Sequence, residues 1–210
     1  MRLLREEIGR KMRPDAAFII LFALTAILFI VSRLSGFLLG YVGSLHIGLF
    51  AVALYFLYER DLGALLARLG IPGDMRANAL YTVAGLAAIL VSLVLMTLAF
   101  GYLGLDDQGN VVSIANGLPL EVLALAIVLA PLTEELFFRA FLSPRIGIVA
   151  SSLLFGIFHV AYGSVVEIAG AFVIGMILAA MFRKSGSLVP PMAAHLAYNL
   201  VSILVIRGFV

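Results

Sequence analysis

Ionisable and amide side chains interrupt apolar sequence at three places in the second half of the chain. The segments are PLTEELFFR, FGIFH and PPMAAHLAYN, and their polar residues are Glu134, Glu135, Arg139, His159, His195 and Asn199. A carboxylate shielded from water can take a proton from a water molecule and later deliver it to a leaving amine. Imidazole and carboxamide N–H groups can stabilise an oxyanion. Together these groups suit the hydrolysis of a peptide bond.

The spacing within each segment indicates which side chains share a helix face. Residues four apart lie on one face, so Glu135 and Arg139 form one pair and His195 and Asn199 another. Consecutive residues of an α-helix diverge by about 100°. We therefore expect Glu135 to pair with Arg139 in a supporting role, while Glu134 alone faces a cavity shared with the two His residues.

Composition sets the environment of these segments. Of 210 residues, 63% are hydrophobic and only 12% are charged, whereas soluble domains are about 45–50% apolar and about 25% charged. The sequence thus predicts an all-α fold, a polytopic bundle of transmembrane helices. An ionisable side chain at the bilayer centre costs about 2.5–3.5 kcal/mol, so the polar residues should face one another inside the bundle. The chain has no Cys, which excludes thiolate catalysis and thiolate metal sites.

A span needs about 20 apolar residues, and the apolar stretches predict about seven spans plus interfacial helices. The predicted spans are 16–32, 37–58, 79–103, 119–142, 146–162, 165–182 and 188–206. The connector 59–78 should contain a short interfacial helix that ends before Pro72 and Gly73. We expect an exposed loop at 104–117.

We divide the chain into three parts: a basic interfacial segment at 1–15, N-terminal transmembrane helices and connectors at 16–117, and a catalytic core at 118–206. The cations gather on one side of the predicted membrane, which places the N-terminus in the cytoplasm by the positive-inside rule. The cations on that side, besides those of residues 1–15, are Arg60, Arg68, Arg76, Arg145, Arg183 and Lys184. The expected location is a cell membrane, and the short compact chain favours a prokaryotic one.

The three motifs E-E-x-x-x-R, F-x-x-x-H and H-x-x-x-N, in this order, resemble those of the CPBP family of intramembrane proteases. That family includes the CAAX prenyl proteases and the bacteriocin-processing or self-immunity (Abi) proteins. The resemblance covers about residues 118–205. It implies an endopeptidase in which Glu134 and His159 activate water, and in which His195 and Asn199 stabilise the oxyanion.

A zinc centre is the alternative chemistry for the same residues. Glu134, His159 and His195 could be its ligands, with Glu135 as the base. The helical zinc-protease motif H-E-x-x-H is absent, and a Glu135 held by Arg139 would be a poor base. We therefore favour a site without a cofactor.

Two other functions use the same buried groups. A transporter could use the Glu and His residues as an ion or proton pathway, and an immunity or scaffold protein could keep the fold without catalysis. The expected partners are membrane lipids and a membrane-tethered peptide or lipidated protein, for example one with a prenylated CAAX tail. The formal net charge of +2 gives no indication of nucleic-acid binding.

Overall fold

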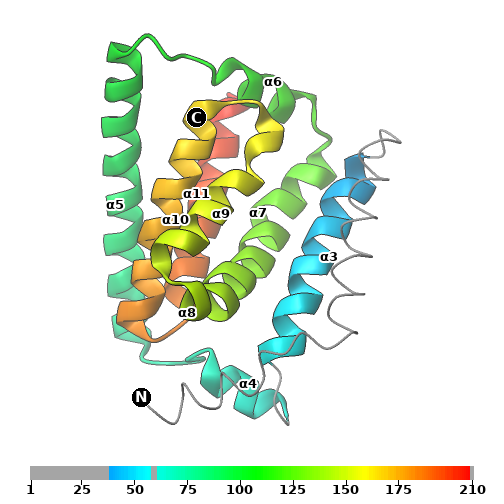
Figure 1. Ribbon diagram of the computed structural model, residues 1–210, viewed down its shortest axis with the longest axis vertical. Coiled ribbons are helices and arrows are strands. Elements are labelled where there is room, and N and C mark those ends of the chain that lie inside the picture. The colour runs from blue at the N-terminus through cyan, green and yellow to red at the C-terminus, as the bar shows by residue number, and fades with distance from the viewer. Residues whose placement is uncertain (1–37, 58–60, 209–210) are drawn as a thin grey trace. The chain divides into compact units, whose positions relative to one another are not determined.

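The computed structural model describes residues 38–57 and 61–208, and these ranges contain helices and turns but no strand (Figure 1). The all-helical class is therefore confirmed for the described chain. The chain divides into two compact units, Met1–Val52 and Ala53–Val210. In the first unit the described part is the beginning of helix α3 (Leu38–Leu57). The predicted helices at 1–15 and 16–32 lie outside the described residues.

The second unit holds the remaining helices and all the candidate site residues. Two of its helical segments are not α-helical, since η1 is a π-helix and η2 a single 3₁₀ turn. In chain order the segments are α4 (Leu62–Arg68), α5 (Met75–Tyr102), α6 (Gly109–Gly117), α7 (Leu120–Glu134), η1 (Glu135–Leu142), α8 (Ser143–Ile146), α9 (Ile148–Phe158), η2 (Val160–Tyr162), α10 (Val165–Ser185) and α11 (Val189–Ile206).

Three described helices, α5, α10 and α11, are long and apolar enough to cross a membrane. A fourth crossing results if α6 and the continuous helical stretch 120–146 count as one span. The axes of these two helical parts differ in direction by 113°. The described ranges thus do not confirm seven spans. The predicted span 146–162 is shorter than a bilayer requires, because α9 ends at Phe158 and a 3₁₀ turn completes the segment.

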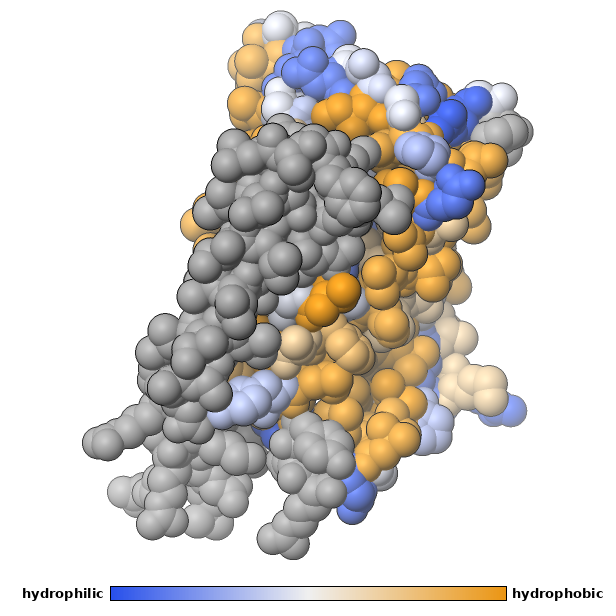
Figure 2. Space-filling view, turned by 90° about the vertical axis from the view of Figure 1, so that its right-hand side faces the viewer, coloured by the Kyte–Doolittle hydropathy of each residue, from blue (hydrophilic) through white to orange (hydrophobic). Residues whose placement is uncertain are grey.

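Helix α5 presents much of its apolar surface outward, as expected for a helix in contact with lipid. Leu80, Val83, Val94 and Leu98 are all more than half exposed. Figure 2 shows, on another face of the molecule, that hydrophobic residues gather at mid-height while most hydrophilic ones lie toward the two ends. This distribution is the one that a bilayer selects.

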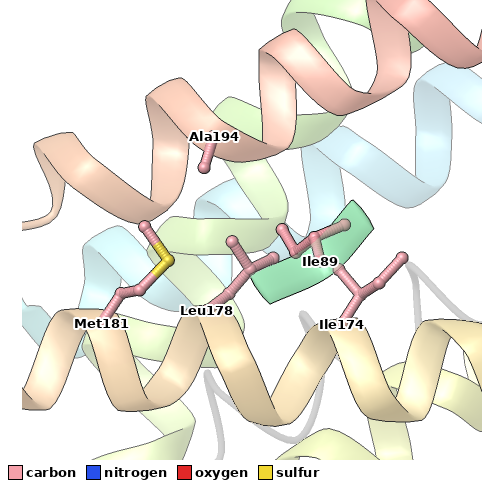
Figure 3. Close-up of a cluster of buried hydrophobic side chains, with 5 residues drawn as sticks. All are labelled: Ile89, Ile174, Leu178, Met181 and Ala194. Atoms are coloured by element: carbon pink, nitrogen blue, oxygen red, sulfur yellow. The ribbon is translucent and has the colours of Figure 1, made fainter. Parts of the chain in front are cut away.

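The interior of the second unit is built around α10, which packs against α9, α5 and α11. Gly85 of α5 leaves the room that the Met181 side chain of α10 occupies, since a Cβ atom there would lie 2.1 Å from the sulfur of Met181. The cluster of buried side chains at this crossing joins α5, α10 and α11 and consists of Ile89, Ile174, Leu178, Met181 and Ala194 (Figure 3).

The connectors agree with the sequence prediction at one end of the bundle and differ at the other. The helix predicted within 59–78 is α4, which has Asp61 as its N-cap and Leu69 as its C-cap and so ends before Pro72. The predicted loop at 104–117 is wrong for its second half, which is helix α6. The polar, Gly-containing sequence suggested a loop, but Ala115 on α6 is buried in the folded unit.

The loop between α5 and α6 is tied to the beginning of α10. The Asp107 carboxylate accepts hydrogen bonds from Ser164 Oγ at 2.6 Å and from the backbone N–H of Val165 at 2.5 Å. The hydrogen bond from Ser164, with those of the backbone N–H groups, lowers the pKa of Asp107 below its ordinary value of 3.8. Asn110 adds a hydrogen bond from Nδ2 to the Gly163 carbonyl at 3.0 Å. These contacts fix the turn that precedes α10.

Candidate active site

The first motif lies where the helix changes its winding. Helix α7 ends at Glu134, and the next eight residues form the π-helix η1. Pro131 in the last turn of α7 lacks the N–H that an α-helix would use there. Short π-helical segments occur frequently at functional sites. The buried residues of η1 include both charged members of the motif, Glu135 and Arg139.

Glu135 connects η1 to α11 through a buried carboxylate. Its Oε1 atom accepts a hydrogen bond from His195 Nδ1 at 2.9 Å, and its Oε2 atom lies 3.1 Å from Arg139 Nε. Glu135 and Arg139 are both fully buried. The ion pair expected from the i, i+4 spacing is therefore present. His195 joins it through its hydrogen bond to Glu135, so the three side chains form one buried network.

Glu134 approaches the same imidazole from the other nitrogen. Its Oε2 atom lies 3.8 Å from His195 Nε2, and 14% of the Glu134 side chain is exposed. The expectation that only Glu134 faces the shared His residues is corrected here, because both carboxylates contact the ring of His195. An ionised carboxylate only accepts hydrogen bonds, so Nδ1 carries a proton and Nε2 is the nitrogen that faces Glu134.

Phe155 lies between the charged groups and the second His residue. Its ring centroid lies 4.8 Å from that of His159 and 5.9 Å from that of His195. The Arg139 guanidinium carbon lies 4.5 Å from the same centroid, which is a cation–π distance. The side chain of Phe155 is buried, with 2% of its surface exposed. Its apolar ring thus separates the imidazoles of His159 and His195.

His159 is the C-cap residue of α9 rather than a residue within a helix. Its Nδ1 atom lies 2.8 Å from the Phe155 carbonyl oxygen and donates to it, so Nε2 is the acceptor nitrogen of the neutral ring. The ring of Tyr162 stacks on the imidazole at 5.9 Å. Tyr162 belongs to none of the three motifs, and its position three residues after His159 is the signal in the sequence that places it beside the site.

Asn199 has a partner on the backbone of α7. Its Nδ2 atom donates to the Ala126 carbonyl at 2.9 Å, a little more than one turn before Pro131. This hydrogen bond joins α11 to the helix that carries Glu134. One of the two amide hydrogens is thereby committed to a structural contact.

The proposed zinc ligands do not form a ligand set as they are arranged. Within 38–57 and 61–208 no three His, Asp or Glu side chains lie close enough together to hold a metal ion. Glu134 and His195 are near one another, but His159 does not join them in a group of three. The donor arrangement of these residues thus does not fit a three-ligand zinc shell.

Comparison with known proteins bears on the segment that carries this site. Residues 116–201 match the sequence model of the type II CAAX prenyl endopeptidase Rce1-like family. The resemblance inferred from the three motifs is therefore confirmed over that segment, which includes Glu134, Glu135, Arg139, His159, His195 and Asn199. Neither the curated proteins nor the solved structures gave a match to the chain.

Proposed function

Since residues 116–201 match the Rce1-like type II CAAX prenyl endopeptidase family, we propose that the chain is an intramembrane endopeptidase with Glu134 as its general base. The family match indicates a protease, and the several long apolar helices indicate that it lies in a membrane. The observation that carries the proposal is the 3.8 Å approach of the Glu134 carboxylate to His195 Nε2. A carboxylate and an imidazole at that distance can both contact one water molecule.

In the proposed reaction, Glu134 accepts a proton from that water as the oxygen attacks the scissile carbonyl carbon. The carbonyl π-electrons move to oxygen, and a tetrahedral oxyanion forms. The intermediate collapses as the C–N bond breaks, and the proton held by Glu134 passes to the leaving amine. Water, substrate and two products balance without a covalent intermediate or a cofactor.

The His residues and Asn199 have the following proposed roles. His159 helps to orient the water through Nε2, since its Nδ1 atom is engaged by the Phe155 carbonyl. His195 and Asn199 stabilise the oxyanion, Asn199 through the amide hydrogen that the Ala126 carbonyl does not take. His195 can do so only when Nε2 also carries a proton, because the Nδ1 proton is used by Glu135.

The proposed substrate is a peptide held at the membrane, and a prenylated C-terminal tail is the first candidate because the matched family is named for it. We further propose a cytoplasmic N-terminus in a prokaryotic cell membrane.

The direct test is cleavage of a prenylated reporter peptide by the purified protein in detergent. Glu134→Gln should reduce turnover by about 10²–10⁴-fold, the usual contribution of a general base. Glu121→Gln changes an exposed residue of the same type on the same helix α7 and should leave turnover unchanged. Near-normal turnover by a folded Glu134→Gln variant would contradict the proposal.

Addition of a metal chelator to this assay distinguishes the metal-free mechanism from the zinc mechanism. We expect turnover to survive prolonged chelation. Loss of turnover that added zinc restores, with one zinc bound per chain, would favour the zinc alternative.

A further inference from the structure

The turn that follows His159 is held by residues outside the segment that matches the family. His159 is the C-cap of α9, and the 3₁₀ turn η2 leads from it to Gly163. Asp107 and Asn110 bind the end of this turn, and both precede the matched segment 116–201. The family match therefore does not cover these two residues.

The contacts of Asp107 and Asn110 hold the far end of the turn. Asp107 accepts hydrogen bonds from Ser164 Oγ at 2.6 Å and from the backbone N–H of Val165 at 2.5 Å. Asn110, in the first turn of α6, donates from Nδ2 to the Gly163 carbonyl at 3.0 Å. The loop before α6 and the beginning of α6 are thus joined to positions 163–165 by three hydrogen bonds.

The near end of the turn begins at His159 itself. The backbone N–H of Tyr162 donates to the His159 carbonyl at 3.1 Å, and that of Gly163 donates to the Val160 carbonyl at 3.0 Å. Because His159 caps α9, the residues after it belong to η2 rather than to another turn of α9. The position of His159 therefore follows the position of η2.

The imidazole of His159 lies between two aromatic rings that come from different elements. The Phe155 ring, on α9, meets it edge-on with centroids 4.8 Å apart and planes at 61°. The Tyr162 ring, on η2, stacks on it with centroids 5.9 Å apart and planes at 24°. A displacement of η2 would move one of these rings and leave the other in place, so the angle of the imidazole would change.

Capping of α10 does not account for all of these contacts. Ser164 already caps this helix, since its Oγ accepts the backbone N–H of Glu167 at 2.9 Å. The hydrogen bond from Asn110 ends at Gly163, which precedes the N-cap and is the C-cap of η2. It satisfies no N–H group at the beginning of α10 and therefore holds the turn itself.

We propose that Asp107 and Asn110 are positioning residues for His159, which they hold through η2 and the ring of Tyr162. This inference rests on the proposed function, in which His159 orients the attacking water. A displacement of 1 Å at a reacting group can cost about 10²-fold in rate. Loss of these hydrogen bonds should lower kcat and change KM little, because the imidazole acts on the water rather than on the bound peptide.

The first test reads the imidazole directly and does not require turnover. Nitrogen-15 labelling of the three His residues in the full-length protein in detergent shows by NMR which ring nitrogen carries the proton. The parent His159 should be protonated at Nδ1, as its hydrogen bond to the Phe155 carbonyl requires. Asp107→Ala and Asn110→Ala should each bring this ring into exchange between its two tautomers.

The His195 signals are the internal control of this spectrum, because its ring is held by Glu135 rather than by the turn. They should be the same in the parent and in both variants. An unchanged His159 spectrum in both variants would overturn the proposal. Equal changes at His195 would also overturn it, since they would indicate a general loss of structure.

The second test is kinetic and uses the reporter peptide. Asp107→Ala and Asn110→Ala should each lower kcat about tenfold, less than a full 1 Å displacement would. Ser164→Thr keeps the hydroxyl that Asp107 accepts and should retain kcat, whereas Ser164→Ala should not.

Asp74→Ala is the matched control, because the Asp74 carboxylate also caps a long helix, α5, at the opposite end of the bundle (Figure 1). It should lower Tm, as Asp107→Ala does, without lowering kcat. An equal loss of kcat in Asp74→Ala would overturn the proposal, because the effect would then follow stability alone.

The two tests separate this proposal from the proposed function. If the parent protein cleaves no peptide while the His159 spectrum changes as expected, the proteolysis is wrong and the hold on the imidazole stands. If the parent cleaves the peptide and the variants alter the spectrum without altering kcat, the proteolysis stands and the positioning role is wrong.

Discussion

Glu135 and His195, 60 residues apart in the chain, are joined by a hydrogen bond of 2.9 Å in the interior of the bundle. The same carboxylate holds Arg139 at 3.1 Å. One side chain therefore balances a buried guanidinium and fixes the imidazole orientation that directs Nε2 toward Glu134. This link between η1 and α11 therefore sets the position of His195 relative to Glu134.

Removal of either partner of the buried ion pair should destabilise the protein strongly. Glu135→Ala leaves the Arg139 guanidinium buried without its carboxylate, and Arg139→Ala leaves the Glu135 carboxylate buried without its guanidinium. Each should lower the free energy of unfolding by about 3–5 kcal/mol. The double variant should lose much less than the sum, since no uncompensated charge remains. Thermal or denaturant unfolding of all four proteins measures this cycle, and strictly additive losses would contradict the pairing.

Asn199 should have a structural as well as a catalytic effect. Asn199→Ala removes the donor to the Ala126 carbonyl and should lower stability by about 1–2 kcal/mol. Asn199→Asp places a carboxylate against a carbonyl oxygen and should be worse than Ala in both Tm and turnover. If Asn199→Asp were as stable as the parent, the hydrogen bond between α11 and α7 would be in question.

Gly156 on α9 should not tolerate a side chain. A Cβ atom there would lie 2.8 Å from the Ile168 carbonyl oxygen on α10. Gly156→Ala should therefore separate the two helices, lower stability by about 1–3 kcal/mol and reduce turnover by moving His159. Gly170→Ala is the matched control, because a Cβ at that position meets no atom within 4 Å. A Gly156→Ala protein with unchanged Tm would show that the two helices can separate freely.

Asp107 should make stability depend on acidic pH. Its pKa in the folded protein lies below its ordinary value of 3.8, chiefly because of the hydrogen bond from Ser164. Its ionised form therefore stabilises the fold at neutral pH, and this contribution is lost as the pH falls below about 4 through the folded-state pKa. Asp107→Asn should have a lower Tm than the parent at pH 7, and the two curves should converge at low pH. A pH-independent difference would indicate that ionisation of Asp107 is irrelevant.

The sequence was sufficient for the class of fold and for the partners that follow from regular helical spacing. Glu135 and Arg139 are paired as the i, i+4 rule predicts. The predicted spans that became α5, α10 and α11 are long and apolar enough that their hydropathy alone identifies them. Hydropathy predicted a full span over 146–162, whereas helix α9 ends at Phe158. A hydropathy average does not show where within an apolar segment a helix ends.

The parts that the sequence did not predict depend on contacts between distant segments. Glu134 and Glu135 are consecutive on a helix and diverge, yet both reach His195, because Nε2 of the imidazole faces one carboxylate and Nδ1 faces the other. The position of Phe155 against Arg139 requires α9 and η1 to pack together. Neither contact can be predicted from the spacing of residues within a single helix.

The π-helical winding of η1 also changes how positions beyond it should be chosen for labelling or cross-linking. A helical-wheel projection drawn from α7 at the α-helical step loses its phase across residues 135–142. The faces that it assigns to Ser143–Ile146 are therefore rotated from the true ones. Paired cysteines or spin labels in this stretch have to be selected from three-dimensional coordinates.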